Sequence, residues 1–289
     1  MQFLKALISL IRVKQWVKNF FVFAPLIFSN SFLDPQKIKE SVFAFILFSL
    51  AASGVYIVND LLDLSYDKKH PIKSIKRPIA NGSISITQAL GTLLAIYAAI
   101  LGLVVYMDLP ESGVIGFYIC VNLVYSKWLK NLPIIDMFIV ASGFVFRVLA
   151  GSLAIHVSLS AWMFITTFSL ALFLASIKRR QELVFLGRSK SPDMSRMVLS
   201  HYSIPLMDKI ALISCISTVL YYSMFVLTIK MELIYSIPIV MYGIFRYWML
   251  VEIFEEGESP TDLVYKDPQI FVVTLIWALY SGYEIFTKN

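Results

Sequence analysis

Nine long apolar runs dominate this 289-residue chain and limit the folds open to it. A helix needs about 20 mostly apolar residues to cross the hydrocarbon core of a membrane, and roughly 17 to 25 are tolerated. The chain is therefore expected to form an all-α, polytopic membrane bundle, with cytoplasmic loops that cap a polar cavity. The nine expected transmembrane helices, of which the first and fourth are short, cover residues 19–33, 42–58, 86–107, 113–125, 135–155, 161–177, 210–229, 233–253 and 270–286.

The composition supports a membrane protein. Hydrophobic residues make up 58% of the chain and charged residues 15%, and the mean hydropathy is +0.74, which is unusual for a soluble domain. No nucleotide-binding glycine loop or low-complexity tract interrupts the pattern, so one transmembrane domain over residues 1–289 is the simplest organisation. Residues 1–18 carry an apolar stripe, with Trp16 near head-group level, and are expected to form an interfacial amphipathic helix. Cys120 and Cys215 lie inside expected spans, which predicts free, buried thiols.

Lysine and arginine collect on one side of the expected bundle. They crowd the stretch before the first span and the second, fourth and sixth connections, whereas the odd-numbered connections offer only Lys37, Lys39 and Lys230. Because positive residues accumulate in cytoplasmic loops, the N-terminus is expected inside and the C-terminus outside a cell (inner) membrane. The net charge of +6 then follows from topology and anionic ligands, and it requires no nucleic-acid partner.

Acidic residues are scarce in this chain, yet three aspartates stand at the end of the second apolar run. On a helix that advances about 100° per residue, they share one arc of roughly 100° with a neighbouring asparagine. Their oxygens can therefore converge on one cation, and oxygen ligands suit a hard ion such as Mg²⁺. The pattern predicts a magnesium site on the cytoplasmic side, formed by Asn59, Asp60, Asp63 and Asp67.

A basic stretch over residues 68–78 follows these acids directly and contributes five cations. Pro71 and Pro78 discourage helix at the residue before each of them, so a loop at the membrane surface is expected. Metal-binding acids beside lysine and arginine suit a diphosphate, because Mg²⁺ bridges its oxygens and the bases neutralise the remaining charge. The basic loop alone would be explained by membrane topology, but the adjoining aspartates favour the diphosphate.

Further bases are expected at the same end of the bundle, in residues 12–19, 125–133 and 178–182. The bases Arg188, Lys190 and Arg196, by contrast, are better explained by contact with anionic lipid head groups.

Two arginines lie inside expected spans. Arg147 is about eleven residues into the fifth span, where an unpaired charge is costly, so it either binds a lipid phosphate or pairs with an acid such as Asp136. For Arg246, structural pairing with the nearby Glu252 is expected.

The acid motif resembles that of the UbiA-type superfamily of intramembrane prenyltransferases, whose nine-helix bundles carry N-D-x-x-D-x-x-x-D after the second helix. Members that prenylate aromatic acceptors generally have a second aspartate-rich motif after the sixth helix. The corresponding segment here, residues 178–183, reads Lys-Arg-Arg-Gln-Glu-Leu, and the only nearby aspartate is Asp193. This departure argues against the usual isoprenyl diphosphate donor.

Within the superfamily, the chain is similar to the decaprenyl-phosphate phosphoribosyltransferase branch. The resemblance implies transfer of 5-phosphoribose from phosphoribosyl diphosphate to a polyprenyl phosphate, with release of diphosphate and Mg²⁺ as cofactor. In that branch the product leads toward arabinose-containing envelope polymers. Several matching segments are more specific than one motif, and here they cover residues 12–19, 59–78, 125–136, 147–151, 178–183 and 257–267.

The resemblance gives each candidate residue an expected role. Asp60, Asp63 and Asp67 are the expected catalytic acids, and Asn59 and Asp63 are expected to bind Mg²⁺ directly, with Asp60 and Asp67 as further ligands or their supports. Tyr56 could orient the sugar. The other expected substrate-binding residues are Tyr125, the phosphate-binding bases Lys18, Lys73, Arg77, Lys127 and Lys130, and the lipid-phosphate bases Lys178, Arg179 or Arg147.

Two other classes of function remain open. A prenyltransferase that moves an isoprenyl group to an aromatic or quinone acceptor would share the bundle and the acid motif. An anion or lipid transporter would also place charges such as Arg147 inside the membrane, but two halves with matching broken helices, which mark many transporters, are not evident. A homo-oligomer is compatible with all three classes.

Overall fold

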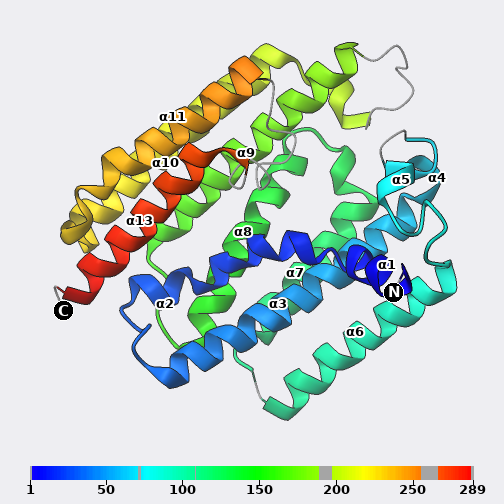
Figure 1. The fold of residues 1–289 in the computed structure, drawn as a ribbon, viewed down its shortest axis with the longest axis horizontal. Helices are drawn as coiled ribbons and strands as arrows, with labels where there is room; N and C mark the ends of the chain where they lie inside the picture. Colours follow the sequence, from blue (N-terminus) through cyan, green and yellow to red (C-terminus); the bar gives the residue numbers. More distant parts are fainter. Residues whose placement is uncertain (1, 71–72, 108, 189–196, 255–265, 288–289) are drawn as a thin grey trace.

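The computed structural model describes residues 2–70, 73–107, 109–188, 197–254 and 266–287, and within these ranges the chain is helical, with no strand (Figure 1). The prediction of an all-α protein is confirmed. The helices, with 3₁₀ segments written η, are α1 Gln2–Leu10, η1 Val13–Phe23, α2 Ala24–Phe28, α3 Pro35–Leu62, α4 Leu64–Asp67, α5 Lys73–Lys76, α6 Ile86–Met107, α7 Ser112–Lys127, η2 Leu129–Asn131, α8 Ile135–Ala154, α9 Ala161–Arg188, η4 Met197–His201, α10 Ile204–Ile229, η5 Met231–Leu233, α11 Ser236–Phe254 and α13 Pro268–Thr287.

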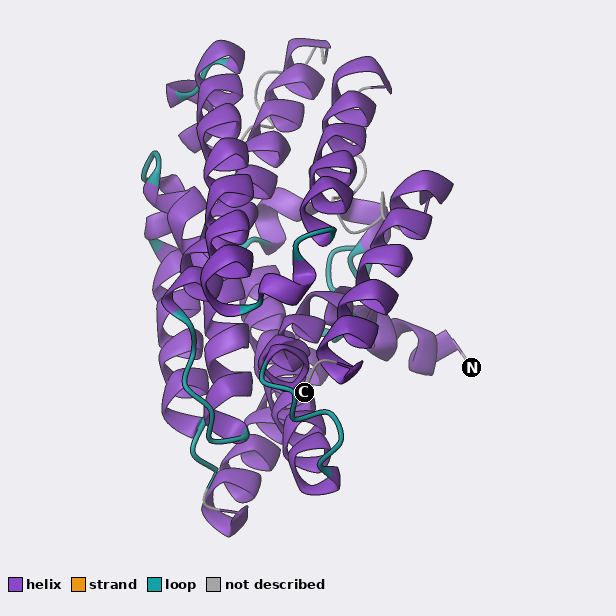
Figure 2. Cartoon of the chain, turned by 90° about the vertical axis from the view of Figure 1, so that its left-hand side faces the viewer, coloured by secondary structure: helices purple, strands orange, loops and turns teal. Residues whose placement is uncertain are grey.

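Among the described residues, seven helices are long and apolar enough to cross a membrane: α3, α6, α8, α9, α10, α11 and α13. Turned by 90°, the chain shows most of its long helices running roughly side by side (Figure 2). α6 and α13 are the least buried of them, and α6 presents apolar side chains such as Leu94, 72% exposed, outward. Outward-facing leucine and valine suit contact with lipid, and the chain is a multi-pass membrane protein.

The two remaining expected spans coincide with shorter elements, so the count of nine stays a prediction. α7 has 16 residues, and the first expected span is divided between η1 and α2. Because a 3₁₀ helix rises about 2.0 Å per residue instead of 1.5 Å, η1 and α2 together rise roughly 30 Å. Few residues thus cover a length close to that of the hydrocarbon core.

The helix expected over residues 1–18 ends early, at Leu10. Arg12 adopts a left-handed conformation with φ of 53°, and the chain continues as η1. Tertiary hydrogen bonds to α3 account for the break: the Trp16 indole donates to Ser53 Oγ at 3.1 Å, and Ser53 Oγ donates to the Ile11 carbonyl at 2.8 Å. Only α1 keeps the exposed apolar stripe of an interfacial helix, formed by Phe3, Leu4 and Ile8.

α3 is the central helix of the amino-terminal half. Asp34 caps it by accepting the Gln36 and Lys37 backbone N–H groups, and its 28 residues span roughly 42 Å. η1, α6, α7 and α8 all pack against it. α9 packs on α8 and α10, and α11 packs on α13, which completes the bundle (Figure 1). The end of α3 leads directly into α4 and α5, so this end of the bundle holds the acid motif.

Both cysteines are free thiols, as expected. Cys215 is buried on α10, but Cys120 is exposed on α7, so the expectation that both are buried is wrong for Cys120. α7 presents one face outward, and Cys120 shares the exposed surface of that helix with Phe117 and Val124.

α8 and η1 touch backbone to backbone at Gly151, which is why this position is glycine. A Cβ atom placed on Gly151 would lie 1.9 Å from the Val22 carbonyl oxygen, and backbone cannot yield as a flexible side chain can. We expect Gly151→Ala to destabilise the protein by roughly 3 kcal/mol, the upper range for overpacking. Gly116→Ala on α7 is the matched control, because nothing lies within 4 Å of its Cβ position. Thermal unfolding in micelles should show a lower Tm for Gly151→Ala alone, and equal Tm values for the two variants would contradict this packing.

Candidate functional site

The acid motif begins on one helix and ends on the next. α3 ends at Leu62, and Asp63, with φ of −92° and ψ of 6°, separates it from α4. The expected uninterrupted helix is therefore broken at Asp63. Hydrogen bonds nevertheless cross the break, because the Asp63 N–H donates to the Asn59 carbonyl at 2.9 Å and the Asp67 N–H to the Asp63 carbonyl at 2.8 Å. Asp60 and Asp67 thus remain on a common side.

Asp60 and Asp67 are buried, at 2% and 1% exposure, and they share one base. Arg77 Nη1 donates to Asp60 Oδ1 at 2.7 Å and also forms a short contact with Asp67 Oδ2. Arg12, from the turn between α1 and η1, pairs with the same Asp60 oxygen, and Lys73 Nζ lies 3.9 Å from Asp67 Oδ1. Segments from three parts of the chain therefore meet at this carboxylate pair.

Asp63 makes a separate ion pair. Its Oδ1 contacts Lys130 Nζ from η2, and both side chains are partly exposed. This contact ties the connection between α7 and α8 to the motif. The expected convergence of the motif's three acids on one point is not found, since Asp60 and Asp67 face Arg77 while Asp63 faces Lys130.

The donor chemistry of the carboxylate pair fits a hard divalent cation. Asp67 Oδ1 is buried and accepts no hydrogen bond, so this carboxylate oxygen has an open coordination position. Asp60 and Asp67 already converge on one positively charged group, Arg77. Within the described residues, no cluster of three or more His, Cys, Asp or Glu side chains is close enough to hold a metal by itself. A cation here would accordingly need additional ligands, such as phosphate oxygens.

Aromatic rings and further bases surround this centre. The Arg12 guanidinium lies 4.7 Å from the centre of the Tyr56 ring, and Lys73 Nζ lies 4.8 Å from that of Tyr66. Lys127 is exposed, with its ammonium 4.5 Å from the Trp128 ring, and Lys18 is half-buried on η1. Of the expected substrate-binding residues, the structure thus gathers Tyr56, Lys73 and Arg77 at the carboxylate pair.

A second buried network joins α8 to α9, and sequence reasoning did not find it. Arg179 Nε donates to Asp136 Oδ2 at 2.7 Å, and the Tyr202 hydroxyl donates to Asp136 Oδ1 at 2.5 Å. Burial, and then the bond to this carboxylate, raise the pKa of Tyr202. Tyr125, at the end of α7, is close enough to interact electrostatically with Arg179. Arg179 and Tyr125 therefore belong to the network around Asp136, and Lys178 precedes Arg179 on α9.

Arg147 does not pair with Asp136, so that alternative is wrong. Asp136 is already engaged by Arg179, and Arg147, 4% exposed, donates instead to Asn19 Oδ1 at 2.7 Å and to the Gly143 carbonyl at 2.6 Å. Three aromatic rings lie within 5.5 Å of its guanidinium carbon and stabilise the charge by cation–π contact: Phe48, Tyr118 and Phe144.

The pairing expected for Arg246 is also wrong. Arg246 Nη2 contacts Asp267 Oδ2 at 2.7 Å, and this hydrogen bond holds the pKa of Asp267 below its usual value. Glu252 instead accepts the Trp248 indole N–H at 3.0 Å. Asp267 lies 21 residues after Arg246, and the sequence alone did not indicate that the two side chains would pair. Several expectations concern parts of the chain that the structure does not describe. These parts are the side chain of Arg188, the residues Lys190, Asp193 and Arg196, and the segment 257–265.

Known proteins are similar to this chain in sequence and in fold. A decaprenyl-phosphate phosphoribosyltransferase from Corynebacterium glutamicum is 30% identical over 282 residues, 94% of this chain and 84% of the relative. One from Mycobacterium tuberculosis is 29% identical over 286 residues, 95% of this chain and 92% of the relative. A structure of a UbiA homolog from Archaeoglobus fulgidus bound to GPP and Mg²⁺ superposes with a TM-score of 0.71 at 17% identity, over 99% of this chain and 100% of the other. The UbiA prenyltransferase family model matches residues 20–261, and the chain belongs to that family.

Proposed function

We propose that this protein transfers 5-phosphoribose from phosphoribosyl diphosphate to a polyprenyl phosphate such as decaprenyl phosphate, releases diphosphate, and requires Mg²⁺. Relatives described as decaprenyl-phosphate phosphoribosyltransferases, similar over more than nine-tenths of the chain, support the proposal. We further propose that the acid-motif end of the bundle faces the cytoplasm, with the N-terminus inside the cell membrane, and that the product serves arabinose-containing envelope polymers.

The observation that carries the proposal is that, among the described residues, the acid motif brings two carboxylates together, whereas α9 carries three consecutive bases. Asp60 and Asp67 form the acidic centre. The end of α9 offers Lys178, Arg179 and Arg180 instead. One acidic centre suits one diphosphate, and further bases suit the two monophosphates of this reaction, those of the ribose and of the lipid. Arg179 and Arg180 pair with Asp136 and Asp208 in this structure, and a bound phosphate would take the place of a carboxylate.

The reaction exchanges one bond at the anomeric carbon. The C1–O bond to the diphosphate breaks, the diphosphate leaves with the electron pair, and an oxygen of the lipid phosphate forms the new bond to C1. Bound Mg²⁺ would stabilise the negative charge of the departing diphosphate. The lipid phosphate is already ionised near pH 7, so this mechanism assigns no general base.

The chain's own residues would position the donor. Asn59, Asp60, Asp63 and Asp67 are the proposed metal-binding residues, and Asp67 has the clearest open oxygen. Tyr56 lies beneath Arg12 at the edge of the carboxylate pair, where a ring could orient the sugar. The bases proposed to hold the donor's phosphates are Lys18, Lys73, Arg77, Lys127 and Lys130.

Lys178 and Arg179, with Tyr125 nearby, are the residues that we propose for the lipid phosphate, because both lie on α9, a helix long and apolar enough to cross the membrane. Arg147 is better suited to a structural role. Its guanidinium is enclosed by rings and bonded to Asn19 and Gly143, which holds α8 against η1.

Isoprenyl transfer to an aromatic acceptor is the second candidate, because structures with the same fold bind GPP or DMAPP with Mg²⁺. The two candidates differ in donor. Purified protein in micelles should incorporate label from phosphoribosyl diphosphate into decaprenyl phosphate with Mg²⁺, and lose this activity in EDTA. A parallel reaction with isoprenyl diphosphate and an aromatic acceptor should give no product. Product in the parallel reaction alone would identify an ordinary prenyltransferase, and no product in either would favour a transporter.

Asp67→Asn tests the acidic centre with little change in shape. We expect transfer to fall at least about 100-fold, the usual scale for loss of a group that stabilises transition-state charge. Glu252→Gln is the matched control, because this exposed carboxylate lies at the same end of the bundle near Arg180. It should keep near-normal activity. Initial rates at saturating Mg²⁺ make the comparison, and a near-normal rate for Asp67→Asn would exclude the centre from the reaction.

A further inference from the structure

A polar pocket lies at the opposite end of the bundle from the acid motif. It has a volume of about 220 Å³ and is bounded by the first turns of α3, the connection between α6 and α7, and the end of α8. Such a volume is far above the roughly 10–15 Å³ that one water needs. Glu40 lies on α3 twenty residues before Asp60, roughly 30 Å along the helix axis. The pocket therefore belongs to the other boundary of the membrane, and the proposed reaction makes no use of it.

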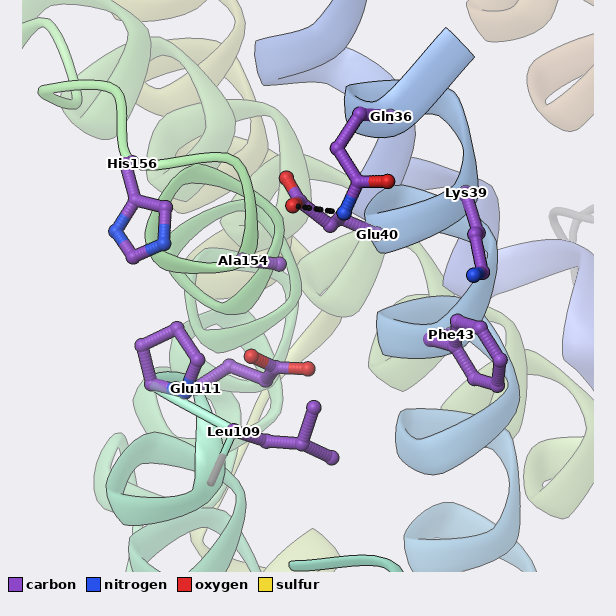
Figure 3. A pocket seen from close by; sticks show the side chains of 9 residues that line it. Gln36, Lys39, Glu40, Phe43, Leu109, Glu111, Ala154 and His156 are labelled. Carbon is purple, nitrogen blue, oxygen red and sulfur yellow. Dashed lines mark hydrogen bonds between the residues drawn. The ribbon is translucent and has the colours of Figure 1, made fainter. Parts of the chain in front are cut away.

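Glu111 is the unusual residue of this pocket. Its side chain is 1% exposed, yet its Oε2 accepts no hydrogen bond. Figure 3 shows the carboxyl group turned toward the space beside α3, where Glu40 and Gln36 lie. A buried carboxylate with an unpaired oxygen is costly. Burial, together with the nearby charge of Glu40, raises the pKa of Glu111. A positively charged ligand would remove that cost.

The other charged residues of the pocket determine which kind of ligand it can bind. Glu40 Oε1 accepts the Gln36 amide at 2.8 Å, which leaves its second oxygen for a ligand. Lys39 is exposed, with its ammonium 6.0 Å from the Phe43 ring, and His156 lies at the rim across from α3 (Figure 3). The two acids thus lie between the two bases (Figure 3), so a ligand whose cationic tip reaches the acids can place an adjoining anionic group beside His156.

We propose that the pocket binds a primary ammonium group joined to a phosphate, as in the phosphoethanolamine head group of a membrane lipid. The ammonium donates hydrogen bonds to Glu111 and Glu40, and the phosphate lies at the rim beside His156. A metal ion is a poorer match, because no three metal-binding side chains in the described part of the chain come close enough together. A trimethylated ammonium is also poorer, since it has no N–H group to offer Glu111 Oε2.

Lipid retention tests this site in the full-length protein. The protein is reconstituted with equal amounts of phosphatidylethanolamine and phosphatidylcholine, washed in micelles, and analysed for retained lipid by mass spectrometry. Wild type should retain phosphatidylethanolamine about tenfold over phosphatidylcholine, a scale set by roughly 1.4 kcal/mol. Glu111→Gln should abolish the preference. Glu232→Gln is the matched control, because this carboxylate lies on η5, between α10 and α11, and pairs with Lys230.

Two further arms keep the test decisive if Glu111→Gln folds poorly. Glu40→Gln should reduce the preference, because it removes the second acid. Soluble phosphoethanolamine added at increasing concentration should displace the retained lipid if the head group alone is recognised, which separates a soluble source from a lipid one. Equal retention of the two lipids by wild type, or an unchanged preference in both Glu111→Gln and Glu40→Gln, would overturn the proposal.

Discussion

Two buried carboxylates meet at the end of α3, and one guanidinium lies against both. Arg77 joins Asp60 to Asp67 across the break at Asp63, and Arg12 adds a second base to Asp60. Removing either partner from such a buried group leaves an uncompensated charge, which typically costs about 3–5 kcal/mol. The turn at Arg12 and the connection that carries Arg77 are both held by these contacts. The local architecture of this end of the bundle therefore depends on charge pairing more than on apolar packing.

The same pairing suits a centre that accepts a metal diphosphate. Under the proposed function, Asp60 and Asp67 would hold a divalent cation that supplies the positive charge now supplied by Arg77, and Arg77 would then be available to the phosphates of the donor. Charge is then balanced in both states. This exchange would account for the position of the bases of residues 68–77 directly after the acids, and for the Asp67 oxygen that accepts no hydrogen bond.

The helices could be predicted from sequence because lipid imposes a simple rule: long apolar runs become helices. Side-chain partners could not, since they depend on packing between distant segments. Arg147 bonds to Asn19 and Arg246 to Asp267, whereas nearer acids had been expected. No sequence pattern indicated that Tyr202 would bind Asp136. The sequence also did not predict that the first helix ends before Arg12, because the cause lies in hydrogen bonds to α3.

Metal binding at the carboxylate pair can be measured directly by electron paramagnetic resonance, with Mn²⁺ in place of Mg²⁺. Free Mn²⁺ is titrated with purified protein, with and without phosphoribosyl diphosphate, for the wild type and for a variant with both Asp60→Asn and Asp67→Asn. We expect wild type to bind Mn²⁺ tightly when the diphosphate is present. With the variant, we expect only the weaker binding of Mn²⁺ to the diphosphate itself. Equal Mn²⁺ binding by the two proteins would contradict metal binding at the carboxylate pair.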